Sequence, residues 1–232
     1  MIRKYLLTVM LIFAVTAGAW AQEDNENKDT VTMSDQAKAF QLASSLAKYG
    51  YANNSASSLI EAAKIIKETG IKDAKDMQPE HENAETTTSN KNSNFSLDAD
   101  KLLADATQLA AGDKNLLALV DNVKKAGTRG GGSVWSRYDR VQANSSDAWA
   151  PFTRSSGWYE FIVDGDGDTD LDLYVYERPE GCKSCSWTLI GKDIDPGDFC
   201  YVKFYSGGFS KEYRAKVKNL GSVYNDYTIV LK

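Results

Sequence analysis

Apolar residues recur with a helical period through the first part of the chain. Residues 34–50 start on a serine that suits a helix N-cap and end on a glycine. In the helix expected next, apolar side chains fall at i, i+3, i+4 and i+7, namely at Leu59, Ala62, Ala63 and Ile66. Residues 34–72 are therefore predicted to form a helical hairpin.

A second helical hairpin is predicted over residues 96–127. Asp113 can cap its second helix, and lysines in the last turn with Gly127 beyond them are typical of a helix C-terminus. Residues 73–95, between the two hairpins, hold almost no aliphatic side chains. Such a segment buries too little apolar surface to offset its ordering entropy, so we expect a disordered linker there and a flexible lead-in over residues 22–33.

From residue 133 onward the pattern has the period of a strand. Tyr213, Ala215 and Val217 alternate with charged residues, as in a half-buried strand. About seven such short segments follow one another over about a hundred residues. The predicted class is thus α+β: a helical N-terminal region followed by an antiparallel β-sandwich over residues 133–232.

The N-terminal residues indicate the compartment of the protein, and the net charge limits the partners that it can bind. Residues 1–21 combine Arg3 and Lys4, a short apolar run and a small-x-small end at positions 19–21, which is typical of a cleaved signal peptide. We expect a secreted or periplasmic protein without membrane insertion, because no second apolar segment is long enough to span a bilayer. The formal net charge of −5 makes nucleic acid a poor partner.

The sequence contains three cysteines, Cys182, Cys185 and Cys200. An oxidising compartment favours one disulfide and leaves one thiol over. Cys182 and Cys185 are the favoured pair, since Cys200 alternates with polar positions and is expected on a core face, but the connectivity stays open. A redox or zinc site at Cys-Lys-Ser-Cys lacks the βαβ setting or the further ligands that it would need.

Enzyme chemistry has few candidate residues. The single histidine, His81, lies in the predicted linker, which excludes a histidine-dependent triad or zinc site in the sandwich. A carboxylate pair that hydrolyses glycosides would need a substrate cleft, for which so small a domain leaves little room. We therefore predict that the protein is not an enzyme.

The stretch VDGDGDTDLDLYVY, residues 163–176, carries an aspartate at every second position. On a straight strand these carboxylates would extend over roughly 25 Å, beyond the reach of one ion. The intervening glycines favour a curled loop, which would present several oxygen ligands to Ca²⁺. The predicted calcium ligands are Asp164, Asp166, Asp168, Asp170 and Asp172. The alternative, which stays open, is a polar hairpin turn whose aspartates accept hydrogen bonds from backbone N–H groups.

Three blocks, GDGDTDLDLYVY, DFCYVKFY and VKNLGSVYNDYTIVL, resemble the bacterial pre-peptidase C-terminal domain, in the variant of secreted proteins that a helical segment precedes. The resemblance spans about residues 97–232. It implies a jelly-roll-like sandwich that acts as a non-catalytic appendage of exported enzymes. Some related collagen-binding modules hold calcium near the start of the sandwich, where this chain has the aspartate run. The chain departs from the usual arrangement, since no peptidase domain is attached and the loop ERPEGCKSCSWTLIG is lengthened, and its partner stays open.

The leading prediction is a secreted, non-catalytic binding or structural module, accessory to extracellular or periplasmic proteins, with a protein or polysaccharide ligand. The alternative is a carbohydrate-binding module that stacks sugars on exposed aromatic rings. Its candidate residues are Trp135, Trp149, Trp158 and Trp187. Core packing of the same tryptophans is the competing explanation, and at least two coplanar exposed rings would favour the carbohydrate alternative.

Overall fold

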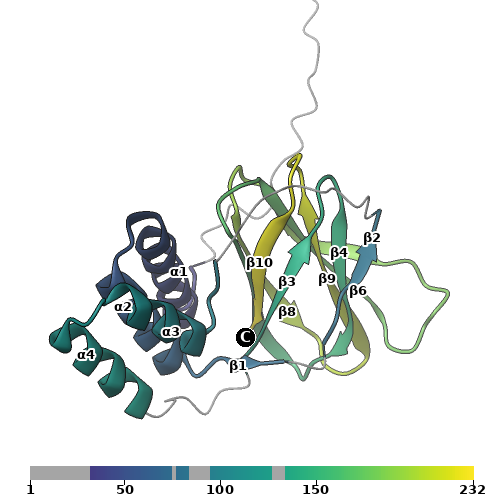
Figure 1. Cartoon of the computed structure of the whole chain (residues 1–232). Helices are drawn as coiled ribbons and strands as arrows, with labels where there is room; N and C mark the ends of the chain where they lie inside the picture. Colours follow the sequence, from purple (N-terminus) through teal and green to yellow (C-terminus); the bar gives the residue numbers. More distant parts are fainter. Residues whose placement is uncertain (1–31, 75–76, 84–94, 127–133) are drawn as a thin grey trace, which may run out of the picture.

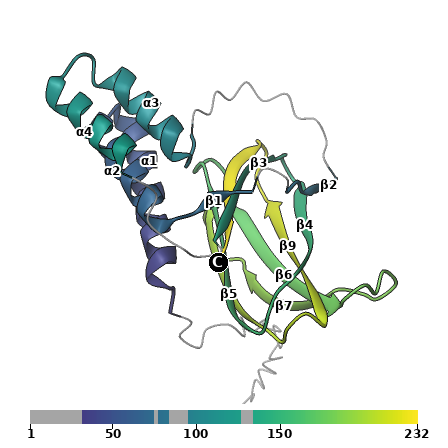
Figure 2. The ribbon, with the colours of Figure 1, turned by 90° about the horizontal axis from the view of Figure 1, so that it is seen from below.

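The computed structural model describes residues 32–74, 77–83, 95–126 and 134–232. A helical unit is followed by two five-stranded sheets that pack face to face. In Figure 1 the helices lie to one side of the sandwich, and Figure 2 shows them beside only one of its two sheets. The predicted class, a helical region followed by an antiparallel β-sandwich, is confirmed. Within the described ranges, none of the helices has the length and apolar character needed to cross a membrane.

The helical unit holds α1 (Asp35–Asn53), α2 (Ala56–Thr69), α3 (Ala99–Leu109) and α4 (Lys114–Lys125). A side-chain oxygen caps the start of each helix by accepting a hydrogen bond from a backbone N–H of its first turn. The capping residues are Ser34, Ser55, Asp98 and Asp113. Local sequence therefore sets where each helix begins.

Two helix boundaries differ from the prediction. Helix α1 continues past Gly50 and ends at Asn53, because Asn54 adopts the left-handed conformation with a φ of 50°. A Cβ at Gly50 would collide with the side chain of Leu59, so this glycine allows α1 and α2 to approach closely. Helix α3 begins at Ala99 with Asp98 as its cap, whereas the predicted hairpin begins at residue 96.

The first sheet has the strand order β1-β3-β10-β5-β8, and the second has the order β2-β4-β9-β6-β7. Neighbouring strands are antiparallel, except that β1 runs parallel to β3. The strands are β1 (Lys72–Asp73), β2 (Glu80–Glu82), β3 (Trp135–Val141), β4 (Ser146–Thr153), β5 (Gly157–Gly165), β6 (Leu171–Pro179), β7 (Thr188–Asp193), β8 (Phe199–Ser206), β9 (Lys211–Asn219) and β10 (Asn225–Leu231).

The segment predicted to be a disordered linker contains the strand β2 and the last residue of β1. Strand β1 pairs with β3, and β2 pairs with β4, so each lengthens one sheet at its edge. The prediction for residues 73–95 is therefore wrong at these strands, because edge pairing satisfies backbone N–H and C=O groups without aliphatic side chains. Residues 75–76 and 84–94 lie outside the described ranges, as do the predicted signal peptide over residues 1–21 and most of the predicted lead-in.

Strand β4 has no counterpart among the strands predicted from the sequence. It contains Pro151, and its pairing with β9 shifts register between Trp149 and Phe152. A proline and a bulge both interrupt the alternation by which a strand is recognised. Strand β4 adds one strand to the second sheet beyond those predicted, and it does not change the class of the fold.

Two apolar cores lie on opposite faces of the first sheet. Phe161 and Val163 of β5 point into the space between the sheets. Ile162, between them in sequence, points the other way and joins Val230 in the core that the helices bury, with Phe40 of α1. All the strand residues of this helical core come from the first sheet or its margins. The outer face of the second sheet thus stays clear of the described helices (Figure 2).

Candidate ligand-binding face

Asp164, the first of the predicted calcium ligands, faces helix α1. Lys48 of α1 donates hydrogen bonds to Asp164 Oδ1 at 2.7 Å and to Asp198 Oδ2 at 2.6 Å. The Asp164 side chain is 1% exposed, and burial raises its pKa to about 6 although Lys48 opposes the shift. Burial alone would lower the pKa of Lys48, but the two carboxylates outweigh it and raise that pKa. Asp164 therefore joins the helices to the sandwich.

Asp166 and Asp168 lie in the turn after β5. One carboxylate oxygen of Asp166 accepts from the backbone N–H of Asp168 at 3.3 Å. The other accepts from the backbone N–H of Asp226 at 3.0 Å, which ties the turn to the start of β10. Accepting backbone N–H groups in this way is the role that the polar-turn alternative gives to aspartate.

Asp170 and Asp172 point to further, separate partners. Asp170 accepts from the backbone N–H of Gly197 at 2.8 Å, and Asp172 accepts from the Tyr174 hydroxyl at 2.9 Å. Across the described ranges, no three or more His, Cys, Asp or Glu side chains are grouped as metal ligands would be. Calcium binding by the aspartate run stays a prediction, and the observed contacts favour the polar turn.

The favoured cysteine pair lies at disulfide distance. Cys182 and Cys185, in the loop between β6 and β7, are joined with their Cα atoms 5.4 Å apart. Cys200 is a free thiol that is 1% exposed, and its Sγ–H donates to the backbone carbonyl of Leu171 at 3.0 Å. Burial raises the pKa of the Cys200 thiol well above its usual value, which disfavours the nucleophilic thiolate.

His81 lies on the sandwich, so its exclusion from this domain was wrong. Its Nδ1 lies 2.7 Å from Oδ1 of the buried Asp147, because the pairing of β2 with β4 sets the two residues side by side. Asp147 also accepts from the Tyr227 hydroxyl, which in turn accepts from Trp149 Nε1–H, both at 2.8 Å. Among the described residues, the hydrogen bonds of His81 lead into this core network and to no serine or cysteine nucleophile.

The four candidate tryptophans have different surroundings. Trp149 is 0% exposed and Trp135 packs at the margin of the core, so core packing accounts for both. Trp158 is 65% exposed, but its ring meets the ring of Tyr205 at 68° and the two share no plane. Trp187 is half-buried at the end of the loop that leads into β7. It is the one candidate that lies beside other aromatic and basic side chains of the second sheet.

The outer face of the second sheet gathers aromatic and basic side chains. Tyr174, Tyr176 and Arg178 alternate along β6 with residues that point into the core. The rings of the two tyrosines are within 24° of parallel, with centroids 6.5 Å apart. Strand β9 sets Lys216 opposite Tyr174 and Arg214 opposite Tyr176. We call this set the aromatic–basic face, and it consists of Tyr174, Tyr176, Arg178, Trp187, Arg214 and Lys216.

Trp187 holds two guanidinium groups in place. The Cζ atom of Arg178 lies 4.2 Å from the centroid of the Trp187 ring, and that of Arg214 lies 5.0 Å from it. Arg214 also lies over the ring of Tyr176, at 5.4 Å. Such cation–π contacts hold the guanidinium groups by their attraction to the ring faces.

Glu212 connects this face to the disulfide loop. Its Oε2 accepts from Arg178 Nε, and its Oε1 accepts from the backbone N–H of Gly181, both at 2.8 Å. These hydrogen bonds lower the pKa of Glu212, that from Gly181 most. The start of the loop that carries Cys182 and Cys185 is thereby tied to β9, and the loop itself projects away from the helices in Figure 2.

The position of Tyr174 and Tyr176 on one face is encoded in the sequence of β6. Polar and aromatic residues alternate along β6 with the residues that point into the core. They are Asp172, Tyr174, Tyr176 and Arg178. Period-two alternation places such residues on one face. The contribution of Arg214 has no such local signal, because it depends on the pairing of β6 with β9.

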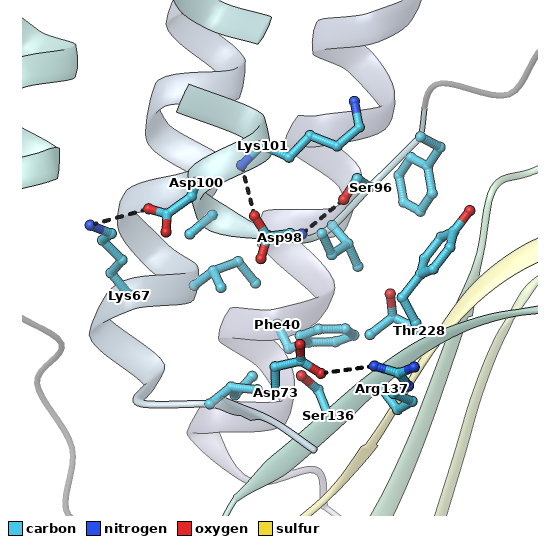
Figure 3. A pocket seen from close by; sticks show the side chains of 16 residues that line it. Phe40, Lys67, Asp73, Ser96, Asp98, Asp100, Lys101, Ser136, Arg137 and Thr228 are labelled. Atoms are coloured by element: carbon cyan, nitrogen blue, oxygen red, sulfur yellow. Dashed lines mark hydrogen bonds and ion pairs between the residues drawn. The ribbon is translucent and has the colours of Figure 1, made fainter. Parts of the chain in front are cut away.

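A cavity of about 540 Å³ lies between the helices and β3 (Figure 3). Its floor is apolar, and its charged groups largely pair with one another: Lys67 with Asp100 at 3.8 Å, and Arg137 with Asp73 at 3.5 Å. Positive and negative groups are therefore balanced around the opening. We favour the aromatic–basic face as the ligand site because it combines aligned rings with Arg214, which forms no ion pair with a carboxylate of the described residues.

No family model matches the chain, and no curated protein matches it. Among solved structures it is similar to a Yersinia pseudotuberculosis-derived mitogen, at 13% identity over 43% of this chain and 85% of that one, with a TM-score of 0.36. It is also similar to the pre-peptidase C-terminal domain of a Bacillus anthracis collagenase, at 13% identity over 44% of this chain and 80% of that one, with a TM-score of 0.25.

A third similar structure is the C-terminal carbohydrate-binding module of a laminarinase from Zobellia galactanivorans. Its identity is 15%, over 39% of this chain and 74% of that one, with a TM-score of 0.24. Likenesses this distant carry no argument about a ligand. The sandwich is established by the pairing of the strands themselves, and the function has to be argued from the site.

Proposed function

We propose that this protein is a non-catalytic module that binds a glycan on the aromatic–basic face. The observation that carries the proposal is the pair of nearly parallel rings, Tyr174 and Tyr176, on the sheet face that no described helix covers. The C–H groups on one face of a sugar ring are weakly positive and pack well against the negative π-face of an aromatic ring. Two aligned rings 6.5 Å apart can support adjoining parts of one chain.

The polar groups around the rings suit sugar hydroxyls. Arg178 and Lys216 supply N–H donors at the two ends of the face. Convergent polar groups that surround an aromatic surface fix the orientation of a ligand and provide its specificity. The face therefore offers both contact area and hydrogen bonds.

A non-catalytic role is supported by the positions of the reactive groups. Cys200 is buried with a raised pKa, and His81 is engaged with Asp147 in the core network. Neither residue belongs to the aromatic–basic face. Export through the signal peptide predicted over residues 1–21 is part of the proposal, and the Cys182–Cys185 pair is compatible with an oxidising compartment. Mass spectrometry of the mature protein tests export, which an intact Met1 terminus would contradict.

Glycan binding is tested by affinity electrophoresis of the full chain through gels that contain single soluble polysaccharides. At least one polysaccharide should retard the protein, and Tyr176→Ala should weaken that binding about tenfold or more because a stacking surface is lost. Trp158→Ala is the matched control: it removes an exposed tryptophan with a lysine over its ring, on the other sheet, and should leave retardation unchanged.

The opposite outcomes are equally clear. Loss of retardation in Trp158→Ala but not in Tyr176→Ala would place the site on the first sheet, and equal loss in the two variants would contradict a site confined to the aromatic–basic face. If no polysaccharide in a broad panel retarded the chain, the glycan proposal would fail and a protein-binding or structural module would take its place.

A further inference from the structure

Arg214 is a half-buried cation on the aromatic–basic face without a carboxylate partner. Its guanidinium lies over the rings of Tyr176 and Trp187. Within the described residues it forms no ion pair, and its Nε is buried without a hydrogen-bond partner. Partial burial of a charge costs free energy unless an opposite charge or hydrogen bonds compensate. The site therefore favours a ligand that supplies an anion.

The nearby carboxylates already have partners. Glu212 uses both oxygens, on Arg178 and on the backbone of Gly181. Glu82 of β2 accepts from Lys216 at 2.5 Å. Asp172 is 5% exposed and accepts from the Tyr174 hydroxyl. None of these groups is positioned to neutralise Arg214.

The charge of this face is opposite in sign to that of the chain. The whole sequence has a formal net charge of −5. On the outer face of β6, β7 and β9, basic residues outnumber the carboxylates of Asp172 and Glu212, also when Glu82 of the edge strand β2, the partner of Lys216, is added. These basic residues are Arg178, Lys192, Arg214, Lys216 and Lys218. A local positive surface on an acidic protein steers anionic ligands to one place.

We propose that the ligand is an anionic glycan, whose carboxylate or sulfate groups bind Arg214 while its sugar rings lie on Tyr174 and Tyr176. This inference rests on the proposed glycan-binding function and narrows its ligand class. A guanidinium whose faces lie against aromatic rings still has N–H groups at its edge, which match the two oxygens of a carboxylate or sulfate.

The test uses two matched pairs of polymers with the full chain: polygalacturonate with its methyl-esterified form, and dextran sulfate with dextran. The wild-type protein should bind at least one anionic polymer about tenfold more tightly than its neutral counterpart, as expected for a charge-assisted contact. The polymer pair that shows the preference identifies a carboxylate or a sulfate as the recognised group. Raising the salt concentration should reduce the preference.

Arg214→Gln should reduce binding of the anionic polymer to the level of its neutral counterpart, so that the preference is lost. Lys203→Gln is the matched control, because it removes a cation 5.5 Å from the exposed Trp158 ring on the other sheet. If Arg214→Gln alters the melting temperature, Arg214→Lys replaces it: this variant keeps the charge but loses the planar donors, and should lose most of the preference.

The outcomes separate this inference from the proposed function. Equal binding of anionic and neutral polymers would overturn the inference and leave glycan binding intact. Equal effects of Arg214→Gln and Lys203→Gln would also overturn it, because net charge alone would then explain the preference. Failure of every polymer, in this set and in the broad panel, would remove the proposed function and the inference together.

Discussion

The two outer faces of the sandwich carry polar residues for different purposes. On the first sheet, Glu160 and Asp164 flank Ile162 in sequence, and helix α1 covers all three. On the second sheet, Tyr174 and Tyr176 alternate with core residues in the same way, but no described helix covers them. The same alternation therefore gives an intramolecular interface on one face and an open surface on the other.

Two carboxylates show how burial under the helices changes the pKa of a side chain. Asp164, under α1, has a pKa raised to about 6 because burial outweighs its ion pair with Lys48. Glu212, on the open face, has a lowered pKa because hydrogen bonds from Gly181 and Arg178 outweigh burial. Burial under the helices thus raises the free-energy cost of an ionised carboxylate on the covered face. Such a carboxylate needs a partner, as Asp164 has in Lys48.

The largest effect is expected where a partner on the covered face is removed. Lys48→Met should lower the free energy of unfolding by about 2–4 kcal/mol, because it leaves Asp164 buried and unpaired. Lys192→Met, on the open face, should change it by less than about 0.5 kcal/mol. Chemical denaturation of the full chain measures both, and equal small effects would contradict the comparison.

This destabilisation has a defined pH dependence. The folded-state pKa of Asp164 is about 6, above an unfolded value of about 3.9, so ionising it costs stability as the pH rises through this window. Loss of Lys48 raises that pKa further. The deficit of Lys48→Met should therefore be larger at about pH 8 than at about pH 5. Asp164→Asn in the Lys48→Met background should restore part of the stability.

Glu212→Gln is the equivalent change on the open face. It should destabilise the protein by about 1 kcal/mol, since water can replace part of the lost contacts. Because the folded pKa of Glu212 is lowered, its contribution is present above the unfolded value of about 4.3 and is lost as the pH falls through the folded value. The deficit should thus disappear in acid, which is the reverse of the trend for Lys48→Met, and the same denaturation series over pH measures it.

His81 should give a smaller effect at the edge of the second sheet. Its hydrogen bond to Asp147 raises its pKa, so the stability it contributes is present below about pH 6.5 and is lost as the pH rises through the folded value. The His81 side chain is 50% exposed, so we discount the effect to about 0.5 kcal/mol. Melting temperatures of His81→Gln, measured over pH, should lack this pH-dependent contribution. If they followed the same pH profile as those of the wild type, His81 would not have this role.

Calcium should have the smallest effect. The carboxylates of the aspartate run already accept hydrogen bonds from separate groups, so we expect millimolar calcium to shift the melting temperature by less than about 1 °C. A calcium site would instead add about 2.7 kcal/mol at a hundredfold excess over Kd, and Asp168→Asn would weaken that response. A saturable rise in melting temperature would establish the site predicted from the sequence and overturn the polar turn.

Local patterns in the sequence determined much of this fold. The helix starts follow from capping side chains such as Ser55 and Asp113, and most strands follow from period-two alternation, because both depend on neighbours in sequence. Strands β2 and β4 had no such pattern. They exist because edge pairing and a bulge are stabilised by partners distant in sequence.

The features of the site also fall into those predicted from nearby residues and those that depend on tertiary contacts. The sequence favoured the Cys182–Cys185 pair and predicted the core position of Cys200, because both follow from residues close together along the chain. Contacts between distant residues bring Asp164 to Lys48 and His81 to Asp147. They also place Arg214, which forms no ion pair among the described residues, between aromatic rings. The physical reason is that burial and ion pairing depend on which sheet face the helices cover, and that choice is made by contacts between residues far apart along the chain.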